Sequence, residues 1–305
     1  MRALSRRTKL ATAAVLALAV AAACLLGLRA RKKRHKGHAT AGPSIAIVNG
    51  TTVDAAAAPR ARGCAAGRPK ASTDGTTRTT RSGRTFHVWG PAAYDDARPY
   101  PVVLMFHGWS SKGRSLEGWF KMEDHVDGAA FTVYPDSEGA TWDFAGAQDL
   151  DFTADVLDAV ADEWCVDRAR VLAFGFSYGA RFVHHLGCKR PDLVRAIVAG
   201  GGSWDTEKPC VGPMPVLVIH RTEDPTMRIA GGRDAAARWA KLDGCSLDTE
   251  VRDAEHGCIA YRGCQAGAVT FCEDTHTDRS WPAGWNHTVR EEYRGLAWSW
   301  FEELR

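Results

Sequence analysis

The stretch Val171-Leu-Ala-Phe-Gly-Phe-Ser-Tyr-Gly-Ala-Arg-Phe-Val183 joins an apolar run, a Gly-x-Ser-x-Gly pattern and the start of a helix-like pattern. A serine on a sharp strand-to-helix turn projects its hydroxyl clear of the backbone, and flanking glycines let neighbouring chains approach closely. The following helix offers backbone N–H groups to a developing oxyanion. We therefore predict a strand over residues 171–174, a helix ending at Gly187, and Ser177 between them as a nucleophile.

Apolar runs on both sides of this stretch predict further strands and helices. Four of them are continuous, as in strands buried on both faces of a parallel sheet: residues 101–106, 131–134, 196–199 and 216–219. Helical spacing of apolar residues occurs over 152–164, 233–242 and 289–304. An edge hairpin is expected over 76–89 and a last short strand over 268–272. The alternation predicts a doubly wound α/β domain over residues 64–305.

The N-terminal region differs in charge from the rest of the 305-residue chain. All ten charged residues before residue 37 are basic, whereas the net charge of the whole chain is only +3, so the remainder is mildly acidic and nucleic-acid binding is not expected. Residues 10–28 carry no charge and are numerous enough for a membrane span or a signal-peptide core. We expect residues 1–36 to export or anchor the chain, and residues 37–63 to form a flexible linker.

The cysteines indicate the compartment. Apart from Cys24, which lies in the uncharged segment, there are eight: Cys64, Cys165, Cys188, Cys210, Cys245, Cys258, Cys264 and Cys272. An even number after an export signal predicts up to four disulfides in an oxidising compartment, with the pairing left open. The alternative is a zinc site built from His256 and the last three cysteines, but their spacings lack Cys-x-x-Cys pairs.

Several short motifs, taken in order, resemble those of the secreted α/β-hydrolases that include feruloyl esterases, acetylxylan esterases and polyhydroxybutyrate depolymerases. They are His107-Gly108, Tyr134-Pro135, Cys165-Val-Asp167, Gly175-Phe-Ser-Tyr-Gly-Ala180, and Asp224-Pro225 followed by Ala230-Gly-Gly-Arg233. The resemblance implies an α/β-hydrolase fold, with a mostly parallel sheet flanked by helices. It also implies ester hydrolysis without cofactor or metal, with Ser177 as nucleophile and Asp224 as the acid of a Ser-Asp-His triad.

The chain departs from this family at two places. His220-Arg-Thr222 stands where the family usually has His-Gly-Thr, so a bulky cation replaces a small residue. Arg279-Ser-Trp-Pro282 stands where the family has its catalytic histidine, so the base must come from elsewhere. Glu223, beside Asp224, is an alternative acid, although Pro225 fixes the turn as the family's Asp-Pro does.

Two histidines after the last strand compete for the role of base. We predict His287, because Thr288-x-x-Glu291 has the form of a capping box and would place His287 one residue before the N-cap of the last helix. The positive end of that helix would then favour a neutral imidazole that can accept a proton. His276 lies nearer the end of the strand and stays the alternative.

The remaining site predictions concern the oxyanion hole and the substrate. We expect the backbone N–H groups of Trp109 and Tyr178 to form the oxyanion hole, and Trp142, Trp281 and Trp285 to bind substrate at the rim of a cleft. The substrate is a feruloyl or acetyl ester of the plant cell wall or a polyhydroxyalkanoate polyester. Alternatives are a lipase or peptidase, or an inactive binding module, which Arg221 and Arg279 suggest. We expect a monomer, either secreted or anchored through residues 10–28.

Overall fold

A computed structural model describes residues 62–64, 73–204, 209–265, 267–277 and 286–304. These residues belong to one compact unit, Ala57–Arg305. The predicted segment 1–36 lies outside the described residues, as does the linker over 37–63 except for Arg62 and Gly63. Within the described part of the chain, none of the helices is both long and apolar enough to cross a membrane. Anchoring through residues 10–28 therefore stays a prediction.

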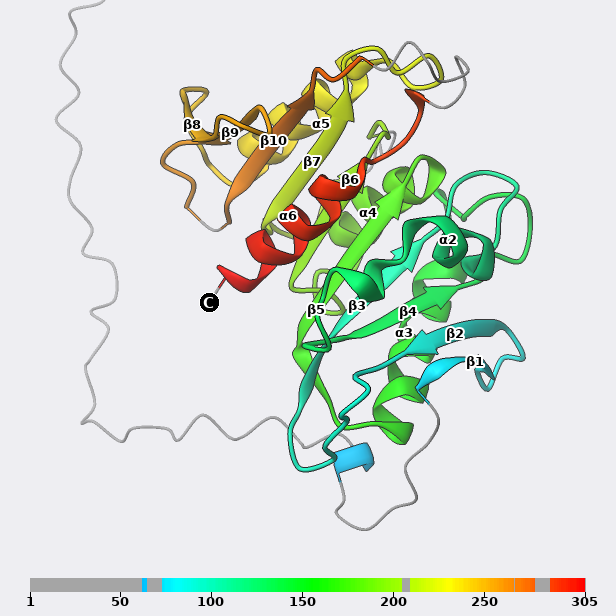
Figure 1. The fold of residues 1–305 in the computed structure, drawn as a ribbon. Coiled ribbons are helices and arrows are strands. Elements are labelled where there is room, and N and C mark those ends of the chain that lie inside the picture. Colours follow the sequence, from blue (N-terminus) through cyan, green and yellow to red (C-terminus); the bar gives the residue numbers. More distant parts are fainter. Residues whose placement is uncertain (1–61, 65–72, 205–208, 266, 278–285, 305) are drawn as a thin grey trace, which may run out of the picture. The chain divides into compact units, whose positions relative to one another are not determined.

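The described residues form a ten-stranded sheet in the order β1-β2-β4-β3-β5-β6-β7-β10-β9-β8 (Figure 1). Its strands are β1 (Asp74–Thr79), β2 (Thr85–Trp89), β3 (Tyr100–Phe106), β4 (Phe131–Pro135), β5 (Val166–Phe176), β6 (Ala196–Gly200), β7 (Val216–Arg221), β8 (Thr249–Asp253), β9 (Cys258–Tyr261) and β10 (Val269–Asp274). The six from β4 to β10 in this order are parallel, and antiparallel strands flank them at both edges. The predicted fold class is confirmed.

Helices cover both faces of the sheet (Figure 1). The first face carries α3 (Gln148–Glu163), α4 (Tyr178–Lys189) and α5 (Ile229–Leu242), and the other carries α2 (Gly113–Phe120) and α6 (Glu291–Glu302). Short 3-10 turns lie at η1 (Arg62–Cys64) and η2 (Met122–Asp124). Because both faces are covered, every residue of β3, β4, β6 and β7 is buried, which explains why their sequences are mostly apolar.

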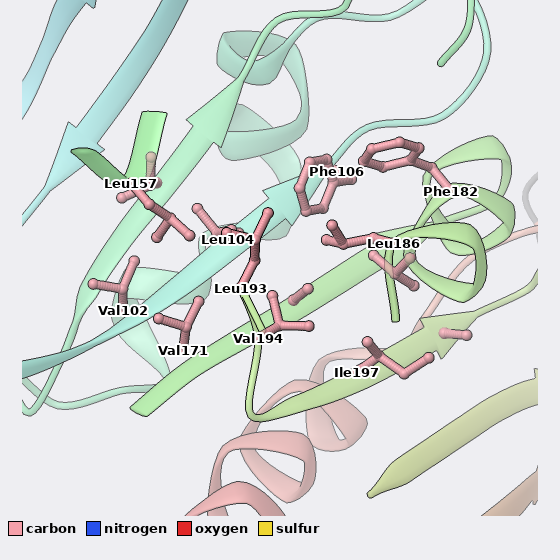
Figure 2. Packing of buried hydrophobic residues seen from close by; sticks show 14 of the residues in the cluster. Val102, Leu104, Phe106, Leu157, Val171, Phe182, Leu186, Leu193, Val194 and Ile197 are labelled. Carbon is pink, nitrogen blue, oxygen red and sulfur yellow. The ribbon is translucent and has the colours of Figure 1, made fainter. Parts of the chain in front are cut away.

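The core on the α3–α4–α5 face is packed directly against the strand that carries Ser177. Figure 2 shows Phe106 of β3 beside Phe182 of α4, whose ring centroids are 5.0 Å apart. Leu104 of the same strand lies near Leu157 of α3 in that view. Burial of each such side chain contributes about 1.5–3 kcal/mol, so the strands and helices that end at the site are firmly held.

The last helix starts later than predicted. It begins at Glu291, its N-cap is Arg290, and no side chain caps it, so the expected Thr288–Glu291 capping box is absent. Tertiary contacts keep the preceding residues extended: Val289 is buried against Gly200, and Arg290 Nε donates to Asp274 Oδ2 at 2.9 Å. The helix α2 and the edge strands β8 and β9 were not predicted.

All eight cysteines after Cys24 form disulfides, as predicted. The pairs are Cys64–Cys165, Cys188–Cys210, Cys245–Cys264 and Cys258–Cys272. The zinc alternative is therefore wrong, because the three cysteines it needs carry no free thiolate, and the described residues hold no group of three or more metal-ligating side chains. Four disulfides are typical of a protein that folds in an oxidising compartment.

Candidate active site

Ser177 lies on a strained turn between β5 and α4. Its φ and ψ are 58° and −116°, values that cost a non-glycine residue about 1–3 kcal/mol and cluster at functional sites. The turn is tight: a Cβ at Gly175 would lie 2.0 Å from the carbonyl oxygen of Gly179, and a Cβ at Gly179 would lie 1.9 Å from that of Phe106. Both glycines of the motif are thus required by close packing, as the sequence predicted.

A chain of two hydrogen bonds links Ser177 to His287 and Asp224. Ser177 Oγ donates to His287 Nε2 at 2.8 Å, and His287 Nδ1 donates to Asp224 Oδ2 at 2.7 Å. A neutral imidazole satisfies both contacts only when its hydrogen is on Nδ1. In this tautomer His287 can accept the proton of Ser177, and a buried carboxylate stabilises the imidazolium that results.

Asp224 follows β7 and is fixed from two sides. Its Oδ1 accepts hydrogen bonds from the backbone N–H groups of Thr226 and Met227, both at 2.8 Å, which leaves Oδ2 for His287. The imidazole of His220 contacts the carbonyl oxygen of Met227 through Nε2 at 2.7 Å and so closes the same turn. Burial lowers the pKa of His220, which keeps this imidazole neutral beside the carboxylate. Glu223 is exposed, whereas the buried Asp224 is the carboxylate that contacts His287.

His276 does not reach Ser177 in this structure. Its side chain is exposed. Its backbone N–H donates to Asp274 Oδ1 at 3.0 Å, and its carbonyl oxygen accepts from Arg221 Nη2 at 2.6 Å. The structure thus brings together Ser177, Asp224 and His287. The expected position of His287 was wrong in detail, because it lies three residues before the N-cap Arg290.

The cation at position 221 lies beside the buried carboxylate of Asp274. The Arg221 side chain is buried, and its Nε lies 3.6 Å from Asp274 Oδ2, which also accepts from Arg290 Nε. Two guanidinium groups therefore flank one buried carboxylate at the ends of β7 and β10. Arg221 gives no support to an inactive binding module, and Arg279, the other residue behind that alternative, lies outside the described residues.

The loop after β3 passes directly beside Ser177. A Cβ on Gly108 would lie 3.2 Å from Ser177 Cβ, so the backbone of Gly108 packs closely against the serine. His107 braces this loop: its Nδ1 contacts the Gly108 carbonyl oxygen at 2.8 Å, and its Nε2 accepts from the N–H of Ser137 at 3.1 Å. Burial lowers the pKa of His107, in keeping with its acceptor role.

The predicted substrate-binding tryptophans have different outcomes. Trp142 is only 2% exposed, so its assignment to the rim of a cleft is wrong. Its Nε1 donates to the carbonyl oxygen of His107 at 2.8 Å, and its ring stacks on Phe182. It supports the loop from behind, because the indole gains a hydrogen bond and full burial there. Trp281 and Trp285 lie outside the described residues, and their role stays a prediction.

Fold and site together define an α/β-hydrolase with a serine, histidine and aspartate at the carboxyl edge of the sheet. The family described as alpha/beta hydrolase fold matches residues 101–213. Feruloyl esterase D of Neurospora crassa is 30% identical over 238 residues, which are 70% of this chain and 79% of that protein. Feruloyl esterase C of Emericella nidulans is 29% identical over 211 residues, 61% of this chain and 78% of its own length.

The fold is also shared with a solved structure. The acetyl xylan esterase from Aspergillus awamori superposes with a TM-score of 0.58 at 14% identity, over 74% of this chain and 98% of that one. The similarity to the two feruloyl esterases is a similarity of sequence, and it extends over most of their length. The chain belongs to the feruloyl esterase family of α/β-hydrolases and is a carboxylic ester hydrolase.

Proposed function

We propose that the chain hydrolyses feruloyl or acetyl esters of plant cell-wall material, with Ser177 as nucleophile, His287 as general base and Asp224 as the residue that orients His287. The observation that carries this proposal is the pair of hydrogen bonds from Ser177 through His287 to Asp224, at 2.8 and 2.7 Å. Removal of the serine proton by a neutral imidazole and its later return to the leaving alcohol is the chemistry that this geometry favours.

The proposed reaction has two steps. Ser177 Oγ attacks the ester carbonyl carbon as its proton passes to His287 Nε2, and the alcohol leaves with that proton, so that an acyl-enzyme is formed. A water molecule then gives a proton to the same nitrogen and attacks the acyl carbon. The bond from that carbon to Ser177 Oγ breaks, the acid is released, and the proton on His287 returns to Ser177 Oγ. Asp224 keeps the imidazole in the required tautomer throughout.

The oxyanion of both tetrahedral intermediates is assigned to the backbone N–H groups of Trp109 and Tyr178. Tyr178 is the first residue of α4, and the first N–H groups of a helix have no acceptor within it. Trp109 follows Gly108, which packs on Ser177. Removal of one such donor reduces kcat by about 10²–10³-fold in known enzymes. Neither donor depends on its side chain.

The substrate class rests on the relatives, which are named feruloyl esterases. Acetyl esters of xylan are the second class of substrate in this proposal, and polyhydroxybutyrate is the competing polyester; the names of these relatives mention neither. We further propose that the chain acts as a monomer outside the cytoplasm, either secreted or anchored through residues 10–28. Membrane fractionation of the full chain against a form without residues 1–36 tests the anchor, and equal distribution of the two forms would rule it out.

The experiment that tests the function is hydrolysis of 4-nitrophenyl acetate by the wild-type chain and by Ser177→Ala. We expect a fall in kcat of at least about a thousandfold, because the residual rate over water in such variants comes only from binding and the oxyanion hole. A panel of methyl ferulate, acetylated xylan and polyhydroxybutyrate then ranks the substrates. A folded wild-type chain that cleaves none of these esters would support the binding module instead.

A further inference from the structure

Arg294, in the first turn of α6, joins three segments that lie around the candidate base. Its Nη1 donates to the carbonyl oxygens of Trp119 and Phe120, at 3.2 and 2.7 Å. Its Nε and Nη2 donate to the carbonyl oxygen of Val289, at 3.4 and 3.3 Å. Val289 lies two residues after His287. One guanidinium therefore ties α6, the end of α2 and the segment that carries His287 to one another.

The shape of the guanidinium suits these three acceptors. Trp119 and Phe120 are the last two residues of α2, and the last carbonyl groups of a helix have no donor within it. The guanidinium also lies over the ring of Phe120, with its central carbon 4.4 Å from the ring centroid, a distance that allows a cation–π contact. Because its donors are arranged in a planar fork, an arginine can reach acceptors on two sides at once, whereas a lysine is a single point charge.

Val289 is also fixed by its side chain, which packs on β6. The side chain is buried, and a Cβ at Gly200 would lie 2.4 Å from Val289 Cγ2, so the valine lies directly on the Gly200 backbone. The carbonyl oxygen of Gly200 in turn accepts from the N–H of Ser177 at 2.9 Å. The backbone that follows His287 is therefore held between Arg294 and the strand that also holds Ser177.

The imidazole of His287 has a second connection to Arg294, through two aromatic rings. The ring centroid of His287 lies 4.9 Å from that of Phe176, and the centroid of Phe176 lies 5.2 Å from that of Trp119. Trp119 is a residue whose carbonyl oxygen Arg294 holds. Arg294 thus reaches the imidazole by two routes, through the backbone after His287 and through these rings.

We propose that Arg294 is a positioning residue, which holds the imidazole of His287 between Ser177 Oγ and Asp224 Oδ2. The inference rests on the proposed function, because that function makes His287 the base. A general base has to lie within hydrogen-bond distance of the proton that it removes, and a displacement of about 1 Å can reduce the rate about 10²-fold. Arg294 acts on the reaction only through His287.

The test is Arg294→Met, which keeps a long side chain and removes every donor. We expect kcat for 4-nitrophenyl acetate to fall by about tenfold to a hundredfold. The value of KM should stay within about twofold of wild type, because the variant displaces the base and removes no substrate contact. Arg294→Lys should recover only part of kcat, since an ammonium group lacks the planar fork.

A second readout reports on His287 without turnover. The short hydrogen bond from His287 Nδ1 to Asp224 should give the Nδ1 proton a low-field NMR resonance in the wild-type chain. In Arg294→Met we expect this resonance to weaken or disappear, because the imidazole is no longer held in one orientation. Circular dichroism shows whether each variant is folded.

The matched control is Arg114→Met, which removes contacts of the same kind at the start of α2. Arg114 Nη2 donates to the carbonyl oxygen of Gly75 at 2.6 Å, and its guanidinium lies over the ring of Trp89, 5.0 Å from the centroid. This variant should leave both kcat and the resonance unchanged.

A folded Arg294→Met with the kcat and the resonance of wild type would overturn the proposal, as would equal falls in kcat in Arg294→Met and Arg114→Met. If Arg294→Met does not fold, Arg294→Lys takes its place, and wild-type values of kcat and the resonance there would overturn the proposal. A wild-type chain that cleaves no ester would instead contradict the proposed function, while the resonance would still show whether Arg294 fixes His287.

Discussion

Ser177 is presented to His287 by a backbone conformation that non-glycine residues rarely adopt. Its φ of 58° is tolerated because the surrounding chain leaves no alternative: the N–H of Ser177 donates to the Gly200 carbonyl oxygen at 2.9 Å, and its own carbonyl oxygen accepts from the N–H of Arg181 at 3.1 Å. The strain is therefore held by β6 and α4, and it places the hydroxyl where an imidazole can reach it.

At this scale we predict that His287 and not His276 is the base. His287→Ala should reduce kcat by about a thousandfold or more, because Ser177 loses its proton acceptor. His276→Ala should change kcat by less than about twofold, because its exposed ring has no contact with Ser177. The measurement is steady-state hydrolysis of 4-nitrophenyl acetate, with circular dichroism as the control for folding. The reverse order of losses would contradict the assignment.

The elements that end at the site are joined by contacts that no single element contains. The buried carboxylate of Asp274, at the end of β10, receives Arg290 Nε from the segment before α6 and lies beside Arg221 Nε at the end of β7. Loss of one charged partner from such a buried carboxylate strongly destabilises the folded protein. This network sets the course of the chain between His287 and α6, which explains why the helix starts at Glu291.

At the element scale, α5 ends at a carboxyl whose protonation should affect stability. Asp243, at the C-cap, is almost fully buried, and burial raises its pKa to about 7 although its Oδ1 accepts from the N–H of Met214. Among the described residues its Oδ2 has no hydrogen-bond partner. The folded state therefore holds a proton that the unfolded state releases near pH 4.

The stability from this group should be complete below about pH 4 and should decline as the pH rises from there to about 7. We expect Asp243→Asn to be as stable as wild type at pH 4 and more stable by about 2–4 kcal/mol at pH 8, because the amide does not ionise. Urea unfolding of both proteins across this range measures the difference. A difference that does not change with pH would show that Asp243 does not titrate in this way.

At the scale of the whole molecule, the parallel sheet gathers distant residues at one edge. Ser177 follows β5, Asp224 follows β7 and His287 follows β10, and these three strands lie on the same side of β3 in the sheet order. Because parallel strands end at the same edge, residues far apart in the chain meet there. The site therefore depends on the complete fold.

The disulfide Cys64–Cys165 joins the start of the domain to the start of β5, over a sequence separation of 101. Replacement of both cysteines by alanine should lower the free energy of unfolding by about 4–5 kcal/mol, because a long loop regains its freedom in the unfolded chain. The control is the same change at Cys245–Cys264, with a separation of 19, where we expect about 3 kcal/mol. Urea unfolding measures both, and a larger loss at the shorter loop would contradict this account.

Local sequence predicted most of the strands, the sharp turn after β5 and the position of Ser177 on that turn. The apolar runs of β3, β4, β6 and β7 are recognisable in the sequence because a strand buried on both faces of the sheet consists mostly of apolar residues. The turn at Ser177 can be recognised in the sequence because close backbone contacts require glycine at positions 175 and 179. Asp224 follows from the same logic, since it comes directly after a buried strand.

Only the tertiary structure decided how the remaining groups are placed. The capping box before Glu291 failed because the ion pair of Arg290 with Asp274 and the burial of Val289 outweigh a local cap. Trp142 proved to be a core residue and Trp119 an exposed one, although both are tryptophans in the sequence. Burial depends on which distant segments pack together, and that is a property of the folded chain rather than of any short stretch of it.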